Sequence, residues 1–215
     1  MKVIDLTHTI SEKMPVYPGD DNPKLETTCS YDEHGFKGTL LTLFSHSGTH
    51  MDAPSHVFAN RTTLDEFPVD QFIGKGIVID CSDLGEGQKI TMKYIEGVKG
   101  RVEQAEFILF YTGWDQYWGT DTYFGEYPTI TEEVADYLIR SKKKGVGLDV
   151  MGIDAISDEN LTIHRRIFVE TDIVVIENLK GLGEVGTELF TFCAFPIKYE
   201  NSDGAPVRAV ALLEK

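Results

Sequence analysis

Residues 107–111 read FILFY, a run of five apolar or aromatic residues followed at once by Thr112 and Gly113. Three other short runs resemble it: GIVID at residues 76–80, VGLD at residues 146–149 and IVVI at residues 173–176. Short runs rich in β-branched and aromatic residues are typical of strands that are buried on both faces. The sequence therefore predicts a group of central strands.

Helix-like segments lie between these runs. In residues 131–139, TEEVADYLI, Thr129 or Thr131 can cap the first turn, acidic residues follow, and three lysines and Gly145 end the helix. Residues 91–98 form a weaker helix candidate, and residues 189–195 and 206–213 are strand-like. We find no internal repeat and no flexible linker, so we expect one α/β domain over residues 1–215, a mixed sheet with flanking helices.

The charge of the chain argues against a nucleic-acid partner. The formal net charge is −15, whereas phosphate contacts need clustered Lys and Arg. The densest basic run, RSKKK at residues 140–144, is expected at a solvated helix end, where the helix dipole favours cations.

The three cysteines, Cys29, Cys81 and Cys193, are far apart and form no CxxC pair, so we expect reduced thiols. No stretch is long enough to cross a bilayer, and the N-terminus lacks the apolar run of a signal peptide. These features predict a soluble, cytoplasmic protein with no membrane partner.

Residues 46–56, HSGTHMDAPSH, hold three of the six histidines and an aspartate. His46, His50, Asp52 and His56 are all even-numbered, so an extended chain would point them to one side. Gly48 and Pro54 disfavour a continuous helix. Imidazole and carboxylate are the usual ligands of catalytic Zn²⁺, and also of Mn²⁺ or Fe²⁺, so this segment predicts a metal site. The competing interpretation is a set of ordinary hydrogen-bonding histidines around a turn.

The same segment resembles the HxGTHxDxPxH signature of the cyclase-like metal-dependent hydrolases, which include bacterial kynurenine formamidases and isatin hydrolases. Residues 5–8, 15–20, 175–179 and 203–208 resemble flanking elements of that family. The resemblance implies a cyclase-like fold of the swivelling β/β/α type and at least a homodimer.

The resemblance also assigns roles to individual residues. His46 and His50 are implied to bind one metal, and Asp52 to bridge two metals or to bind a single one. His56 is implied to be the catalytic acid/base, although it could be a further ligand. His164 and Glu177 are implied to complete a second metal site.

Two of these assignments can be compared with local sequence. Glu177 follows four apolar residues at a predicted strand end, where ligands gather in α/β sheets and where a buried carboxylate needs a partner. His164 has a plainer alternative, packing or capping beside Arg165 and Arg166. His8 is expected to be structural and His34 to be solvated.

Tyr17 departs from the family pattern. Formamidases of this family usually carry tryptophan in the matching P-x-W-P-G-D segment, where it lines the substrate pocket. Tyrosine keeps an aromatic wall but changes its size and adds a hydroxyl. The resemblance therefore does not fix the identity of the substrate. Phe44 and Trp114 are further wall candidates, with core packing as the alternative.

The implied activity is a metal-dependent amide hydrolase, arylformamidase-like, that converts N-formyl-L-kynurenine to L-kynurenine and formate with activated water. Two zinc ions per chain are expected, with manganese as the alternative. The competing functions are a cyclic-amide hydrolase of the isatin-hydrolase type and a non-catalytic metal-stabilised binding protein.

Overall fold

The computed structural model describes residues 1–214. The predicted strands at residues 76–80, 107–111, 146–149, 173–176, 189–195 and 206–213 all appear, with ends shifted by up to three residues. The strands are β1 Lys2–Asp5, β2 Lys24–Cys29, β3 Gly38–Thr42, β4 His50–Asp52, β5 Ile73–Asp80, β6 Lys89–Ile90, β7 Phe107–Tyr111, β8 Thr129–Ile130, β9 Gly145–Leu148, β10 Val174–Glu177, β11 Phe190–Pro196 and β12 Gly204–Leu213.

Eight strands form one mixed sheet in the order β1-β12-β11-β5-β7-β9-β10-β4, and β4 pairs in addition with β12. Strands β5, β7, β9 and β10 pair parallel with one another, whereas every pairing that involves β11, β12, β4 or β1 is antiparallel. The extra pairing closes seven strands into a barrel. The sequence predicted the mixed sheet correctly but did not predict its closure. The swivelling β/β/α description stays a prediction.

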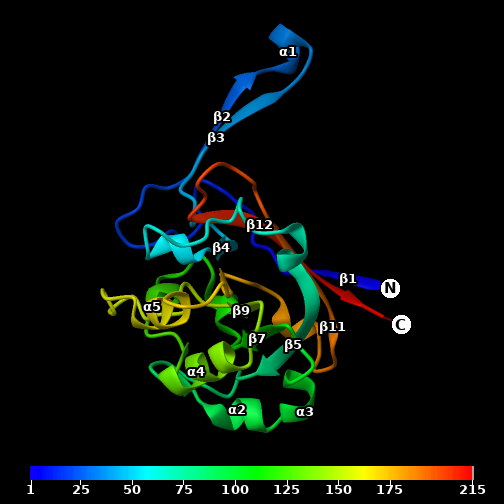
Figure 1. Ribbon diagram of the computed structural model, residues 1–215. Coiled ribbons are helices and arrows are strands. Elements are labelled where there is room, and N and C mark those ends of the chain that lie inside the picture. The colour runs from blue at the N-terminus through cyan, green and yellow to red at the C-terminus, as the bar shows by residue number, and fades with distance from the viewer. Residues whose placement is uncertain (215) are drawn as a thin grey trace.

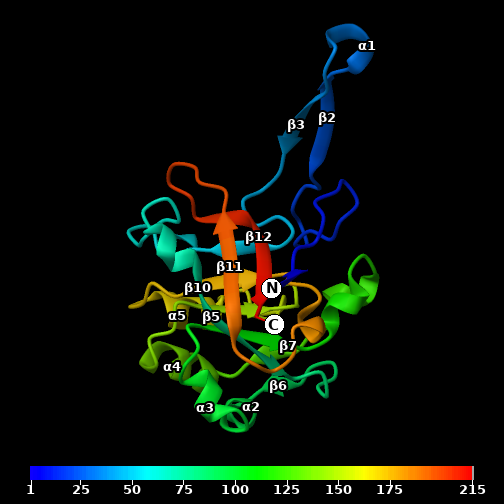
Figure 2. The same cartoon turned by 90° about the vertical axis from the view of Figure 1, so that its right-hand side faces the viewer.

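The long strand β12 makes closure possible. One of its edges pairs with β11, while the other pairs with β4 at residues 204–206 and with β1 at residues 210–213. The two chain ends therefore lie side by side, and β11 and β12 run together along one side of the barrel (Figure 2).

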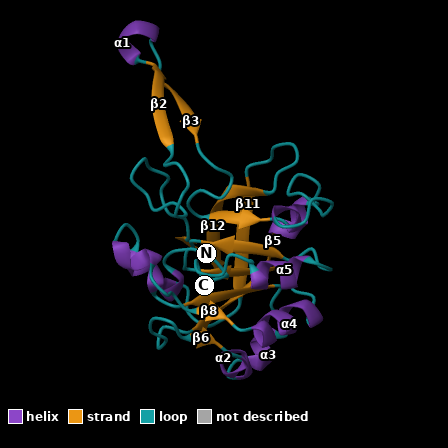
Figure 3. Cartoon of the chain, turned by 90° about the vertical axis from the view of Figure 1, so that its left-hand side faces the viewer, coloured by secondary structure: helices purple, strands orange, loops and turns teal. Residues whose placement is uncertain are grey.

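The central strands are buried on both faces, as predicted. On β7, Phe107 and Leu109 pack into the barrel interior, whereas Ile108 and Phe110 pack against the helical layer. Glycine makes room inside the barrel: a Cβ at Gly147 would lie 2.7 Å from the side chains of Leu109 and Leu179. Helices α2, α3 and α4 lie at the end of the molecule opposite strands β2 and β3 (Figure 3).

Helix α4 begins as predicted, because the Thr131 hydroxyl accepts a hydrogen bond from the backbone N–H of Val134. The weaker candidate at residues 91–98 contains α2. The helices are α1 Tyr31–His34, α2 Met92–Glu96, α3 Lys99–Val102, α4 Glu132–Arg140 and α5 Thr162–Phe168, and the 3-10 turns are η1 Pro54–His56, η2 Val69–Phe72, η3 Trp114–Tyr117, η4 Asp121–Phe124 and η5 Leu182–Glu184.

The basic run after α4 is only partly a solvated helix end. Lys143 is 6% exposed, and its ammonium donates hydrogen bonds to the carbonyls of Val102 and Ala105, each at 2.6 Å. The expectation of a fully solvated run was wrong at this position, because the lysine satisfies the carbonyls at the end of α3.

Strands β2 and β3, with α1 between them, form an arm that projects from the barrel (Figure 1). Tyr31, Phe36, Leu40 and Leu41 on the arm are more than half exposed. His34 lies near the tip and is exposed, as expected. Within residues 1–214, no helix is long and apolar enough to cross a membrane.

Candidate metal centre

Strand β4 lies at the closure of the barrel, between β10 and β12. Its register places His50 opposite Glu177 of β10, and Asp52 opposite Gly204 of β12. His50 and Asp52 project to the same side of the strand, as their two-residue spacing predicts. Met51, between them, is fully buried in the barrel core.

His46 joins these residues from the loop before β4. Gly48 takes a left-handed conformation, with φ +65°, and turns the chain between His46 and His50. His46 Nδ1 then lies 2.6 Å from Asp52 Oδ1, and His50 Nε2 lies 3.3 Å from the same oxygen. His46, His50 and Asp52 thus form one group of converging ligand atoms.

A second group consists of Asp52, His164 of α5 and Glu177 at the end of β10. His164 Nε2 lies 3.3 Å from Asp52 Oδ2 and 3.4 Å from Glu177 Oε1. His164 therefore faces the carboxylates, while the neighbouring Arg166 pairs with Asp136 and Glu132 on α4. The plainer interpretation of His164, packing beside its arginines, does not describe its contacts.

Both buried carboxylates divide their oxygens between the two groups. Asp52 directs Oδ1 to His46 and His50, and Oδ2 to His164. Glu177 directs Oε2 to His50 at 3.4 Å, and Oε1 to His164. This is the arrangement that two bridging carboxylates would need.

The remaining ring nitrogens of two histidines are held by neighbours. His50 Nδ1 donates to the carbonyl of Gly48 at 2.8 Å, and His164 Nδ1 lies 2.7 Å from Asp154 Oδ2. The backbone N–H groups of Ile163 and His164 also donate to Asp154. Such outer partners fix the ring orientation and leave Nε2 free for a ligand, as is common around metal sites.

The ionisable groups of the centre shift one another's pKa values. Burial lowers the pKa of His50, but the Asp52 carboxylate outweighs burial and raises this pKa to about 10. Burial also lowers the pKa of His46, and the Asp52 carboxylate again outweighs burial and raises this pKa to about 9. Although burial opposes it, His50 and His46 hold the pKa of Asp52 well below its usual range. The carboxylates therefore favour positive charge at these positions, which a divalent cation would also supply.

His56, at the end of η1, belongs to neither of these groups but forms a third with His46 and Asp203. Its Nδ1 is 4.0 Å from Asp203 Oδ2, and its ring centroid is 4.1 Å from that of His46. Burial lowers the pKa of His56 to about 4. Its imidazole is therefore neutral at neutral pH and can accept a proton.

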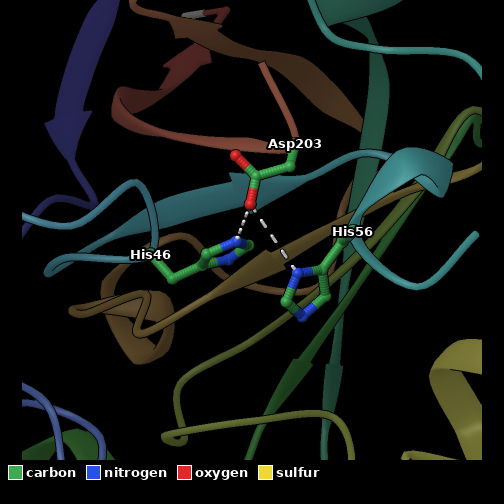
Figure 4. A group of neighbouring side chains, drawn as sticks. All are labelled: His46, His56 and Asp203. Atoms are coloured by element: carbon green, nitrogen blue, oxygen red, sulfur yellow. Dashed lines mark hydrogen bonds and ion pairs between the residues drawn. The ribbon is translucent and has the colours of Figure 1, made fainter. Parts of the chain in front are cut away.

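Asp203 is the residue that sequence reasoning missed (Figure 4). Its Oδ2 lies 2.9 Å from His46 Nε2, while Oδ1 accepts a hydrogen bond from the Tyr199 hydroxyl at 3.1 Å. The available signal was its place in residues 203–208, which resemble a flanking element of the family, shortly before the predicted strand at residues 206–213. Nothing in the sequence indicates that this strand would close the barrel beside β4.

Gly204 leaves the space that the His46 ring occupies, and we call this space the seat of the ring. A Cβ at this position would lie 2.4 Å from His46 Cε1 and 2.8 Å from Nε2. Only glycine leaves the ring its space between Asp52 and Asp203.

A cavity of about 470 Å³ opens above the centre. Both donor groups and His56 line it, and so do the aromatic residues Tyr17 and Phe44, which were wall candidates. Trp114, the third wall candidate, is buried in the helical layer and is not among the lining residues. His8 is structural, as expected: it is buried and stacks on Trp118 with ring centroids 3.9 Å apart.

Known families and proteins resemble this chain over most of its length. Residues 4–155 match the family described as "Putative cyclase". The kynurenine formamidase of Salinibacter ruber is 30% identical over 98% of this chain and 97% of its own length.

Two solved structures share the whole fold. Isatin hydrolase A from Labrenzia aggregata is 25% identical with a TM-score of 0.87, over 99% of this chain and 94% of its own. A structure described as a "Potential Metal-Dependent Hydrolase With Cyclase Activity" is 27% identical with a TM-score of 0.80, over 98% and 96%.

Proposed function

The chain belongs to the cyclase family, and on that premise we propose that it is a metal-dependent hydrolase that cleaves an aryl amide. The sharing of Asp52 and Glu177 between two histidine groups, with His56 beside them in a third group with His46 and Asp203, supports this proposal. An amide hydrolase needs an activated water and a proton carrier next to each other.

The donor set fits divalent cations. Neutral imidazole and carboxylate suit Zn²⁺ and Mn²⁺, and the described chain supplies no cysteine ligand to the centre. We propose that His46, His50 and Asp52 hold one ion, and that Asp52, His164 and Glu177 hold a second, with zinc favoured over manganese. When bound, the ions polarise the substrate carbonyl and lower the pKa of water from about 15.7 towards 7.

His56 is the proposed acid/base. Because its pKa lies at about 4, the neutral ring takes a proton from the attacking water and then donates it to the leaving nitrogen. Asp203 fixes the neighbouring His46 ring through Nε2, and Gly204 leaves that ring its space. Tyr17 and Phe44 flank the cavity, where an aromatic substrate can stack.

Our first choice of substrate is N-formyl-L-kynurenine, which an arylformamidase hydrolyses. The similarity to relatives named kynurenine formamidase favours this choice. The second choice is a cyclic amide of the isatin type, favoured by the likeness to isatin hydrolase A over almost the whole chain. A purely structural metal site fits less well, since such sites are usually closed, whereas this centre faces an open cavity.

The test uses purified protein loaded with Zn²⁺ or Mn²⁺, and measures metal per chain and hydrolysis of both substrates. We expect about two ions per chain and turnover of one substrate. His56→Ala should keep the metal but lose about 10²–10⁴-fold in rate, while His34→Ala, on the distant arm, serves as the matched control. A metal-loaded protein that hydrolyses neither substrate would refute the proposal.

A further inference from the structure

The cavity above the centre has walls of two kinds. Tyr17, Phe44, Met151 and Leu161 provide apolar surface, and Tyr17 and Phe44 are 42% and 49% exposed. Aromatic rings exposed at a cavity are suited to stack on a flat substrate. This apolar wall favours an aromatic ring in the substrate, whatever charge the substrate carries.

The charged part of the lining is entirely acidic outside the histidines. Asp20 and Glu159, which are exposed, and Asp158 line the part of the cavity that we call its mouth. Asp203 lies beside His46. Among the lining residues that the structure describes, there is no lysine and no arginine. A substrate carboxylate would therefore find no cationic side chain at this mouth.

Two of these carboxylates are free for a ligand. Within residues 1–214, Asp20 and Glu159 lack a hydrogen-bond or ion-pair partner, and both are exposed. Asp158 differs, because it accepts hydrogen bonds from the backbone N–H groups of Asn160 and Thr162. Asp20 and Glu159 thus carry the uncompensated charge of the mouth.

Bound cations would not remove this charge. They would compensate Asp52 and Glu177, which are buried at the floor of the cavity. Tyr17 reports the field at the mouth: burial raises the pKa of its hydroxyl, and Glu177, Asp20 and Glu159 raise it further. The mouth is therefore an aromatic surface in a negative potential.

We infer that the substrate is an aryl amide that carries an ammonium group away from the scissile bond, and that Asp20 and Glu159 select it over a carboxylate-bearing analogue. The inference rests on the proposed function and narrows its substrate. N-formyl-L-kynurenine carries both an ammonium and a carboxylate, so it should be a poorer substrate than a matching amine without the carboxylate.

The test separates charge preference from turnover by means of benzohydroxamates, which chelate metals through their hydroxamate. Three para-substituted forms, with aminomethyl, carboxamide and carboxylate groups, present a positive, neutral or negative end. Their Kd values are measured on the metal-loaded protein at low and high salt. The matching para-substituted formanilides are assayed for hydrolysis in parallel.

We expect the aminomethyl compound to bind most tightly and the carboxylate most weakly. In Asp20→Asn/Glu159→Gln, the ratio of their Kd values should shrink by about 5- to 20-fold, as expected for two partly exposed ion pairs. Salt should shrink it in the wild type too. Glu96→Gln/Asp121→Asn removes the same charge from exposed positions outside the cavity lining, and should leave the ratio unchanged.

A ratio near one in the wild type, or a ratio that the cavity variant leaves unchanged, would overturn the inference. Hydrolysis of the formanilides without a charge preference would do so while leaving the proposed function intact. A charge preference in binding without any hydrolysis would support the selectivity of the mouth and count against the proposed function.

Discussion

Asp52 and Glu177 are each almost fully buried, at 1% and 6% exposure, and yet carry ionised carboxylates. Charges this deep are costly without partners. In the described chain their contacts are histidines and the backbone N–H of Ile153. The pairing explains why protonated imidazoles occupy the centre, and why a cation would have to displace protons.

His56 should add little to the acid limb of the pH–rate profile. Since its pKa is lowered to about 4, the neutral base persists as the pH falls through 6.5, where an ordinary histidine becomes charged. At saturating metal we therefore expect log kcat/KM to fall below pH 7 with a slope of about one, from the metal-activated water alone.

A histidine with an unperturbed pKa of about 6.5 would add a second ionisation and steepen this slope to about two. Metal content is measured at each pH as the control. The steeper slope with metal occupancy intact would contradict the assignment of His56.

Gly204→Ala tests the seat of the His46 ring. The added methyl would lie 2.4 Å from His46 Cε1, so the ring must move away from residue 204. We expect a loss of about 10²-fold in kcat/KM, the typical cost of a misplaced catalytic group, together with weaker metal binding. Gly100→Ala, where a Cβ meets nothing within 4 Å, is the matched control. Equal behaviour of the two variants would show that the seat has no role.

At the scale of elements, the segment after α4 joins the helical layer to the barrel. Lys143 lies in the turn before β9, and its ammonium donates to the carbonyls of Val102, at the end of α3, and of Ala105, just after it. Burial lowers the pKa of this lysine. A charged donor is retained here because it satisfies two buried acceptors at once.

Lys143→Met should therefore destabilise the fold even though it replaces a buried charge with an apolar side chain. We expect a loss of about 2 kcal/mol in the free energy of unfolding, since two carbonyls lose their donor. In a chain of this size that corresponds to about 4–8 °C in Tm by thermal denaturation. Lys142→Met, at the exposed neighbour, should shift Tm little, and an equal shift in both would disprove the role of Lys143.

At the scale of the whole molecule, the arm formed by β2 and β3 lacks cover. A two-stranded hairpin is marginally stable alone, and Leu40 and Leu41 expose 53% and 54% of their surface. The expected homodimer or larger homo-oligomer would supply the missing contacts. We therefore propose that the arm packs against a second copy of the chain.

Leu40→Glu/Leu41→Glu should shift the protein towards monomer, because the charges would have to be buried at the contact. Light scattering after size exclusion measures the mass of the assembly. Val69→Glu/Val169→Glu, at exposed apolar residues outside the arm, is the control. A wild-type monomer, or an unchanged assembly in the arm variant, would count against this role of the arm.

Local patterns in the sequence predicted several features of the protein. The strand runs at residues 76–80 and 107–111, the Thr131 cap of α4 and the crowding of residues 46–56 were all legible, since burial, capping and ligand chemistry depend on nearby residues. The approach of His164 and Glu177 to Asp52 was anticipated only by resemblance, because more than a hundred residues separate them.

The remaining features depend on how distant segments of the chain pack together. Closure of the barrel through β12 brings Asp203 and Gly204 against His46, and no local pattern specifies which strand edges will meet. Burial likewise turned Lys143 from an expected surface charge into an internal donor. The physical reason is the same in both cases: partners distant in sequence are chosen by the packing of whole elements, and only the folded chain sets that packing.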